Sequence, residues 1–285
     1  MKKIFFEIVE FIKNPTDQRI DNYSLVKNFR YLFIIFLIDI LINLVFYMPL
    51  ILLLDKVESM VMEPRIIYSQ NTFWVKLFLY SVLAPLSEEI IFRSWLKYRK
   101  FYHFFISRDK WDRIFKYLVY FSTLSFGLVH ISNYENSSTL FYILAPLIVS
   151  TQIFGGFLIA FIRVRFNFIS GILLHSLWNF FALIIVCVPF LKNDDFIKNE
   201  KDYNLKIKEI SFNHDGNQLF KIDSSKQKIH SIHISEYSYN HILDSLFNHN
   251  RHKNDILIDL NFESKNGIDK NSLKKVLLEY DEFID

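Results

Sequence analysis

The chain has 285 residues, of which 51% are hydrophobic, and phenylalanine alone accounts for 31 of them. Six glycines and six prolines are too few for a collagen-like or a Pro/Gly-rich disordered chain, and the single cysteine excludes a disulfide scaffold. The net charge of +3 conceals a difference between two parts, because residues 1–191 carry an excess of lysine and arginine whereas residues 192–285 carry an excess of aspartate and glutamate. This split indicates a membrane-embedded body followed by a polar tail.

Long apolar segments predict an all-α polytopic membrane helix bundle over residues 30–191. A helix needs about 20 apolar residues to cross the hydrocarbon core of a bilayer. Five segments reach or approach that length: 31–54, 73–96, 116–131, 140–162 and 168–191. We therefore expect an integral membrane protein in contact with the lipid bilayer.

The distribution of charge and the overall composition predict where this protein lies. Lysines and arginines are concentrated between residues 97 and 116, and short loops rich in these residues face the cytoplasm. The heavy use of asparagine, lysine, isoleucine and phenylalanine is typical of a bacterium with a low-GC genome. The expected location is the cytoplasmic (inner) membrane of a bacterium.

Residues 1–29 form a basic amphipathic arm in front of the bundle. Apolar side chains recur at helical spacing from Ile4 to Ile12, between Lys2-Lys3 and Lys13. This pattern is typical of a helix that lies on the membrane surface. It is equally typical of a helix that packs its apolar face on the protein itself.

Residues 192–285 are too polar to span a bilayer and predict a small soluble α+β domain. Apolar and polar residues alternate as in half-buried strands over 205–212, 219–222, 229–234 and 256–262. One helix is expected from Ser235, acting as its N-cap, to about Phe247, and a second over residues 272–280. The tail holds no motif that indicates a reaction. A protein partner for it stays open, and no nucleic-acid partner is expected.

Ionisable side chains occur inside three of the apolar segments, where each one costs roughly 2.5–3.5 kcal/mol. The polar residues concerned are Glu88, Glu89 and Arg93 in the second segment, His130 in the third, and His175 and Asn179 in the fifth. Glu89 and Arg93 are four apart and can pair on one helix face. Glu88 is rotated by about 100° from Glu89 and is left for a different task. The polar faces of these segments predict one shared, water-filled cavity.

These residues form three motifs in order: Glu-Glu-x-x-x-Arg, Phe-x-x-x-His from Phe126, and His-x-x-x-Asn. Together they resemble the CPBP family of CAAX-protease and bacteriocin-processing (Abi) intramembrane proteases, which includes the type II CAAX prenyl endopeptidases. The similarity extends to the residues 84–87 before the glutamate pair and to Gly171 before His175, and it covers about residues 73–190. One such motif is common on soluble helices, but three in order within apolar segments are specific.

The resemblance implies an intramembrane endopeptidase with the catalytic residues Glu88, Glu89, His130, His175 and Asn179. Glu88, assisted by His130, would take a proton from the attacking water. His175 and Asn179 would donate hydrogen bonds to the oxyanion that forms on the peptide carbonyl. Arg93 would be the structural partner of Glu89. The substrate would be a peptide or a membrane protein, whether prenylated or simply membrane-associated.

Two alternatives stay open at this point. Glu88, His130 and His175 could instead form a three-ligand zinc site with water in the fourth position. No His-Glu-x-x-His helix is present, so the sequence favours catalysis without a cofactor. The alternative function is a non-catalytic bacteriocin-immunity or scaffold protein of the same fold. Such a protein would not need so many buried ionisable groups.

Overall fold

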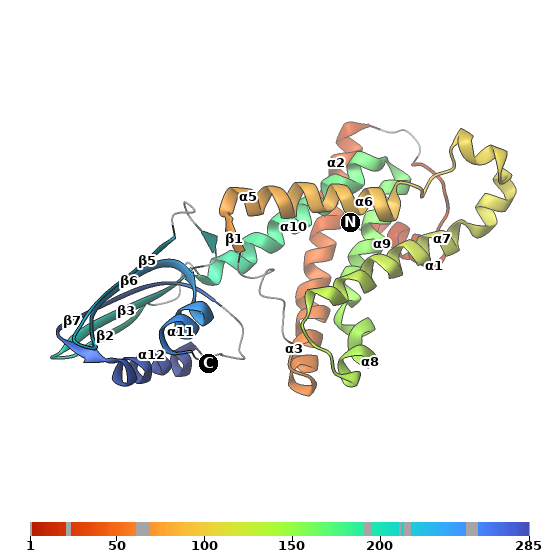
Figure 1. Ribbon diagram of the computed structural model, residues 1–285. Coiled ribbons are helices and arrows are strands. Elements are labelled where there is room, and N and C mark those ends of the chain that lie inside the picture. Colours follow the sequence, from red (N-terminus) through yellow and green to blue (C-terminus); the bar gives the residue numbers. More distant parts are fainter. Residues whose placement is uncertain are drawn as a thin grey trace. The chain divides into compact units, whose positions relative to one another are not determined.

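The computed structural model describes residues 2–20, 24–60, 69–190, 195–210, 212–213, 218–248 and 256–284 (Figure 1). These residues belong to two compact units: Met1–Val61 with Phe78–Ala182, and Met62–Leu77 with Leu183–Asp285. The first unit is helical, and the second is built mainly from a sheet with two helices. The predicted combination of a membrane helix bundle with an α+β tail is confirmed. The second unit begins at Leu183 rather than at residue 192 and also includes residues 62–77.

The described helices before the tail follow the predicted apolar segments closely. They are α1 (Lys2–Lys13), α2 (Leu25–Ile42), the π-helix η1 (Asn43–Tyr47), α3 (Met48–Val57), α5 (Phe73–Phe78), the π-helix η2 (Leu79–Leu83), α6 (Ala84–Arg93), the short 3₁₀ helix η3 (Lys100–Phe104), α7 (Arg108–Val129), η4 (His130–Asn133), α8 (Thr139–Ile148), α9 (Ser150–Arg165) and α10 (Phe168–Phe190).

Four helical stretches of the described chain are long and apolar enough to cross a membrane: Leu25–Val57, Arg108–Asn133, Thr139–Arg165 and Phe168–Ile185. The remaining predicted span, 73–96, is helical from Phe73 to Arg93. It is not one of the four because it carries charged residues, namely Lys76, Glu88, Glu89 and Arg93. These stretches identify an integral membrane protein.

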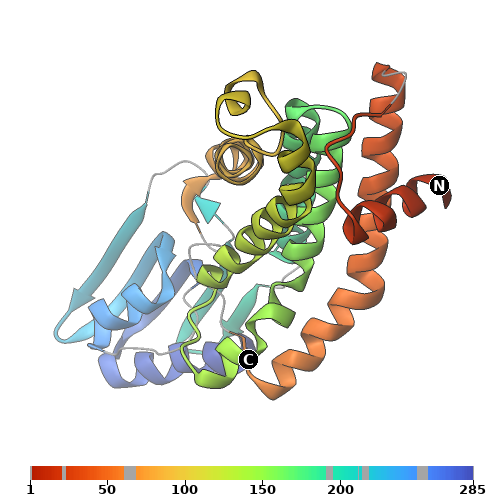
Figure 2. The ribbon, with the colours of Figure 1, turned by 90° about the vertical axis from the view of Figure 1, so that its right-hand side faces the viewer.

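Helix α1 packs on the first unit, which decides between the two interpretations of the N-terminal arm. Its residues Ile4, Ile8 and Phe11 are buried and belong to the main core of this unit. The ring of Phe11 meets that of Phe161 on α9 edge to face, with centroids 5.5 Å apart. Figure 2 shows α1 crossing the long helix formed by α2, η1 and α3. The packed helix is therefore the arrangement observed.

Helix α9 lies at the centre of this unit. Every side chain from Leu158 to Val164 is buried, so the helix is covered on all sides. Helices α7, α2 and α1 each contact it. A helix that is apolar around its whole circumference is expected in such a central position.

The tail unit contains a five-stranded antiparallel sheet in the order β2-β3-β7-β6-β5. Its strands are β2 (Phe196–Asn199), β3 (Tyr203–Ile210), β5 (Leu219–Ser225), β6 (Lys228–Ser238) and β7 (Leu257–Asp269). Helices α11 (Tyr239–Phe247) and α12 (Lys270–Ile284) contribute apolar side chains to a core shared with the sheet. A separate short pair joins β1 (Ser69–Thr72) to β4 (Phe212–Asn213) in parallel.

The expected start of the first tail helix is wrong by three residues. Ser238, not Ser235, is the N-cap of α11, and its hydroxyl accepts a hydrogen bond from the His241 amide at 3.1 Å. Strand β6 continues to Ser238, and its pairing with β7 shifts between Ile234 and Tyr237, where Glu236 takes a left-handed φ of 59°. The hydroxyl of Ser235 donates to Asp259 on β7 instead.

The packing of α1 gives a direct test. Replacing the fully buried Phe11 by alanine should destabilise the protein by about 3–5 kcal/mol, since the change leaves a cavity in the core. Phe6, on the same helix, is 67% exposed, and Phe6→Ala should change stability by less than about 0.5 kcal/mol. The measurement is thermal unfolding of both purified variants in detergent. Equal effects would contradict the packing of α1 on the first unit.

Candidate active site

The site is centred on a buried ion pair within α6. Arg93 Nη1 lies 2.5 Å from Glu89 Oε1, and both side chains are fully buried. The two residues are one helical turn apart, so the same face of α6 presents both charges. Arg93 thus neutralises one of the two adjacent glutamates.

His175 on α10 joins the two glutamates of α6. Its Nδ1 lies 3.0 Å from Glu89 Oε1, and its Nε2 lies 3.5 Å from Glu88 Oε2. The imidazole is buried, whereas the Glu88 side chain is 27% exposed. The two carboxylates therefore differ: Glu89 is enclosed by Arg93 and His175, and Glu88 is the one that water can reach. Figure 1 shows α6 and α10, which carry these groups, running alongside each other.

His130 follows directly after α7, and a backbone contact fixes its ring. The Nδ1 atom lies 2.7 Å from the carbonyl oxygen of Phe126. Because a carbonyl can only accept, Nδ1 carries the proton, and the neutral ring keeps its lone pair on Nε2. His130 also lies within range of the charges of Glu88, Arg93 and His175. It can therefore act on the same reaction centre as Glu88.

Phe126 is the common neighbour of the charged and the histidine side chains. The guanidinium of Arg93 lies over its ring, 3.9 Å from the centroid. The ring centroids of His130 and His175 lie 4.8 Å and 5.5 Å from that of Phe126, both edge to face. A cation over an aromatic face is stabilised by the ring quadrupole. Phe126 thus brings together the motifs of α6, α7 and α10.

Asn179 faces the backbone of the helix that leads into α6. Its Nδ2 donates to the carbonyl oxygen of Tyr80 at 2.9 Å. Tyr80 belongs to the π-helix η2, in which the N–H of Ala84 bonds to the carbonyl of Leu79, five residues back. Pro85, the residue that follows, has no N–H to donate. Asn179 gives the Tyr80 carbonyl a donor from α10 and so helps to position α6 against α10.

Two glycines border the ion pair: Gly171, already part of the similarity before His175, and Gly156, which sequence reasoning did not connect with the site. A Cβ atom on Gly156 of α9 would lie 3.3 Å from Arg93 Nη2 and 3.1 Å from Thr123 Cγ2. A Cβ atom on Gly171 of α10 would lie 3.5 Å from Glu89 Oε2. Glycine inside an apolar helix often marks such a close approach, and that was the signal available in the sequence.

The C-terminal end of α6 is held by a second arginine from α9. Arg163 is buried, its Nε donates to the carbonyl of Arg93, and its Nη2 donates to the carbonyl of Ser94, both at 3.3 Å. The last carbonyls of a helix need such donors, and a cation there also complements the helix dipole. Sequence reasoning missed Arg163 because the predicted apolar segment ended at residue 162, whereas α9 continues to Arg165.

The zinc alternative involves Glu88, His130 and His175. Over the described ranges, no group of three or more His, Cys, Asp and Glu side chains is arranged to hold a metal ion. Both ring nitrogens of His175 face carboxylates, and Nδ1 of His130 faces a backbone carbonyl. These contacts suit proton transfer, and a carbonyl or carboxylate on one ring nitrogen is equally the outer partner of a metal-bound histidine.

Comparison with known families agrees with the motifs. Residues 70–181 match the sequence model of a family described as type II CAAX prenyl endopeptidase Rce1-like. The matched stretch contains all the motif residues, from Glu88 to Asn179. A search of curated proteins found no match, and a search of solved structures found none either.

The contact of Asn179 with Tyr80 can be tested by mutation. Asn179→Ala should lower the free energy of unfolding by about 0.5–1.5 kcal/mol, the usual net contribution of a hydrogen bond, because the part-buried bond between α10 and the Tyr80 carbonyl is lost. The measurement is thermal unfolding of the parent and the variant in detergent. An unchanged stability would show that this bond does not hold α10 against the helix that leads into α6.

Proposed function

Residues 70–181 match the type II CAAX prenyl endopeptidase Rce1-like family, and on that premise we propose that the chain hydrolyses a peptide bond with Glu88 as the general base. The observation that carries the proposal is the difference between the two glutamates. Glu89 is fully buried against Arg93, while Glu88 is partly exposed and faces His175. A base must be within reach of the water that it deprotonates, and Glu88 meets that condition.

We infer that the attacking water binds between Glu88 and Nε2 of His130. Glu88 takes one proton from this water while the water oxygen attacks the carbonyl carbon of the peptide. The carbonyl π electrons move to the oxygen, which becomes the oxyanion of the tetrahedral intermediate. The proton held by Glu88 then passes to the leaving nitrogen as the C–N bond breaks, so the base is restored.

His175 and Asn179 are the oxyanion donors in this proposal. In this proposal His175 acts as an imidazolium, with Nδ1–H directed to Glu89 and the second N–H, on Nε2, beside Glu88 and the reacting groups. Asn179 uses one amide N–H on Tyr80 and has a second one to offer. Donors held in place before the reaction stabilise the developing charge without reorganisation.

The proposed substrate is a membrane-associated peptide or protein, prenylated or not, in the cytoplasmic membrane of a bacterium. An apolar groove of about 490 Å³ lies between α2 and α10 and is lined by residues that include Phe29, Phe33, Leu173, Leu177 and Phe180. Leu174 in the same groove directly precedes His175. Such a surface fits a hydrocarbon chain or an apolar peptide segment, which supports a substrate that reaches the site from the bilayer. A protein partner for the tail is part of the same proposal.

Replacing Glu88 by glutamine tests the function itself. Loss of a general base lowers the rate by about 10²–10⁴-fold, so protein N-termini produced by this protease should disappear in Glu88→Gln cells. The measurement compares protein N-termini by mass spectrometry in cells that naturally make this protein. Ser87→Ala is the matched control, because the Ser87 hydroxyl donates back to the Ala84 carbonyl at 2.9 Å and should leave the profile unchanged.

If the parent and Glu88→Gln proteins are equally abundant in the membrane and give identical N-terminal profiles, the protease assignment fails. The immunity or scaffold function would then be preferred. The immunity or scaffold function is disfavoured because a non-catalytic protein would not need the buried, connected charges of Glu89, Arg93 and His175.

Metal dependence is tested on a substrate found in that comparison. Cleavage by the purified protein should be unchanged after prolonged treatment with 1,10-phenanthroline, because the proposed proton transfers use side chains alone. Activity that is lost on chelation and restored by zinc would overturn the metal-free mechanism and favour a Glu88, His130 and His175 zinc site.

A further inference from the structure

The connection between α6 and α7 exposes three phenylalanines on one side. Phe101, Phe104 and Phe105 are 65%, 85% and 75% exposed. Phe101 and Phe104 are three apart in the 3₁₀ helix η3 and therefore share a face. The ring of Phe105 lies against that of Phe101, with centroids 5.2 Å apart. Exposed aromatic residues that gather on one face indicate a surface that contacts something apolar.

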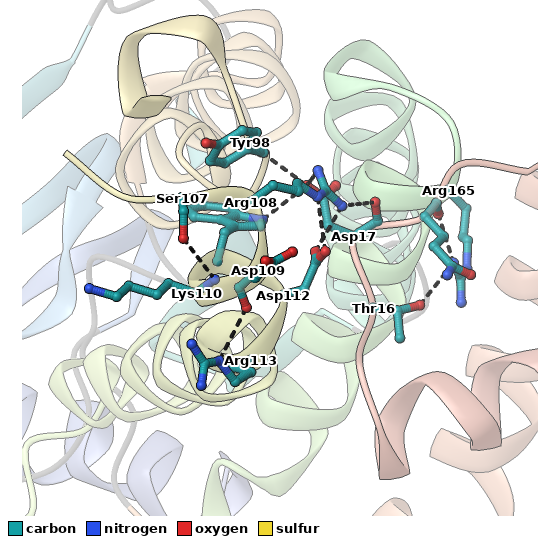
Figure 3. Close-up of polar contacts among 12 residues, drawn as sticks. Thr16, Asp17, Tyr98, Ser107, Arg108, Asp109, Lys110, Asp112, Arg113 and Arg165 are labelled. Atoms are coloured by element: carbon teal, nitrogen blue, oxygen red, sulfur yellow. Dashed lines mark hydrogen bonds and ion pairs between the residues drawn. The ribbon is translucent and has the colours of Figure 1, made fainter. Parts of the chain in front are cut away.

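The opposite side of the same connection is fixed firmly to the helices. The ring of Tyr102 stacks on Trp111 of α7 with centroids 5.2 Å apart, and the Tyr98 hydroxyl donates to the Ile106 carbonyl at 2.7 Å. Asp17 Oδ2 accepts from the Tyr98 amide at 3.0 Å (Figure 3). It also accepts from Trp111 Nε1 at 3.0 Å. The three phenylalanines are therefore held outward by structure rather than being left on a loose loop.

Cations surround the start of this connection. Burial and the charges of Arg19, Arg163 and Arg99 lower the pKa of Lys97, although Asp17 acts in the opposite direction. Lys100 adjoins them in the sequence and is exposed. Positive charges that repel one another in this way would be stabilised by an anion.

We propose that residues 97–105, together with Arg19, form a surface that binds anionic phospholipids. Phe101, Phe104 and Phe105 would enter the boundary between headgroups and acyl chains, while Arg19, Lys97 and Lys100 would contact the headgroup phosphates. Apolar side chains combined with a basic border are the features by which a protein segment binds an anionic membrane surface.

The position of the surface in the chain favours a lipid over a protein as its occupant. It begins four residues after Arg93 at the end of α6 and ends just before α7, the start of a membrane-crossing stretch. A connection this short between two membrane helices stays near the bilayer surface. The excess of lysine and arginine around it selects negatively charged headgroups, because each such cation favours an anionic surface.

This inference does not depend on the proposed hydrolysis, but it has a consequence for the candidate active site. The carbonyl of Ser94 accepts from Nη2 of both Arg99 and Arg163. Arg99 therefore links the lipid-binding surface to the end of α6. A bilayer surface bound at residues 97–105 would fix the depth of Glu88 in the membrane.

Photo-crosslinking in native membranes tests the proposal. The photoreactive analogue p-benzoylphenylalanine is placed at position 104 of the full chain, and the adducts are identified by mass spectrometry. Phospholipid adducts are expected at position 104. The matched control carries the analogue at Tyr102, which faces Trp111 on the other side, and should give crosslinks within the chain and no lipid adduct.

The charge requirement is tested in the same experiment. The lipids attached at position 104 should be enriched in anionic phospholipids over the bulk membrane. Replacing Arg19, Lys97 and Lys100 by glutamine should reduce that enrichment on the order of fivefold for each cation removed. Adducts with another protein at position 104, an absence of adducts, or lipid adducts without anionic enrichment would each overturn the proposal.

Discussion

The buried pair of Glu89 and Arg93 is the interaction on which the rest of the helical unit depends. Both side chains are completely enclosed, and removing one member of such a pair typically costs about 3–5 kcal/mol because the other charge stays buried. The pair also decides the roles of its neighbours. Glu89 is neutralised and orients His175, so Glu88 is the carboxylate that faces both a histidine and water. A structural constraint on one glutamate thus defines the chemistry available to the next.

Three other helices supply the space that this pair needs. Phe126 of α7 covers the Arg93 guanidinium, Gly156 of α9 allows it to approach closely, and Gly171 of α10 lies beside the Glu89 carboxylate. None of these contacts contributes a reacting group. They explain why the motif residues are accompanied by small and aromatic residues at particular positions. In a bilayer, helices associate through close packing rather than through the hydrophobic effect. Close contacts of this kind therefore stabilise a polar site between membrane helices.

The sequence predicted those parts of the structure that follow from local spacing. The interval of four between Glu89 and Arg93 predicted that both lie on one face, and apolar length predicted the membrane helices. Features that need two segments at once were missed. The contact of Asn179 with Tyr80 joins α10 to a π-helix, which the apolar pattern does not indicate. The helix expected from Ser235 starts later, since strand β6 runs on to Ser238 through a register shift at which Glu236 adopts a positive φ. The spacing of apolar and polar residues in a sequence does not indicate such backbone conformations.

Helix α6 is held from outside at both of its ends. At its beginning, Asn179 donates to the carbonyl of Tyr80, and at its end Arg163 donates to the carbonyls of Arg93 and Ser94. These donors come from α10 and α9, the helices that also border the buried ion pair. The height and rotation of Glu88 relative to His175 are therefore set by the fold before any substrate binds. A base and its partner that are already fixed lose little conformational entropy during the reaction. Positioning lowers the activation barrier most under this condition.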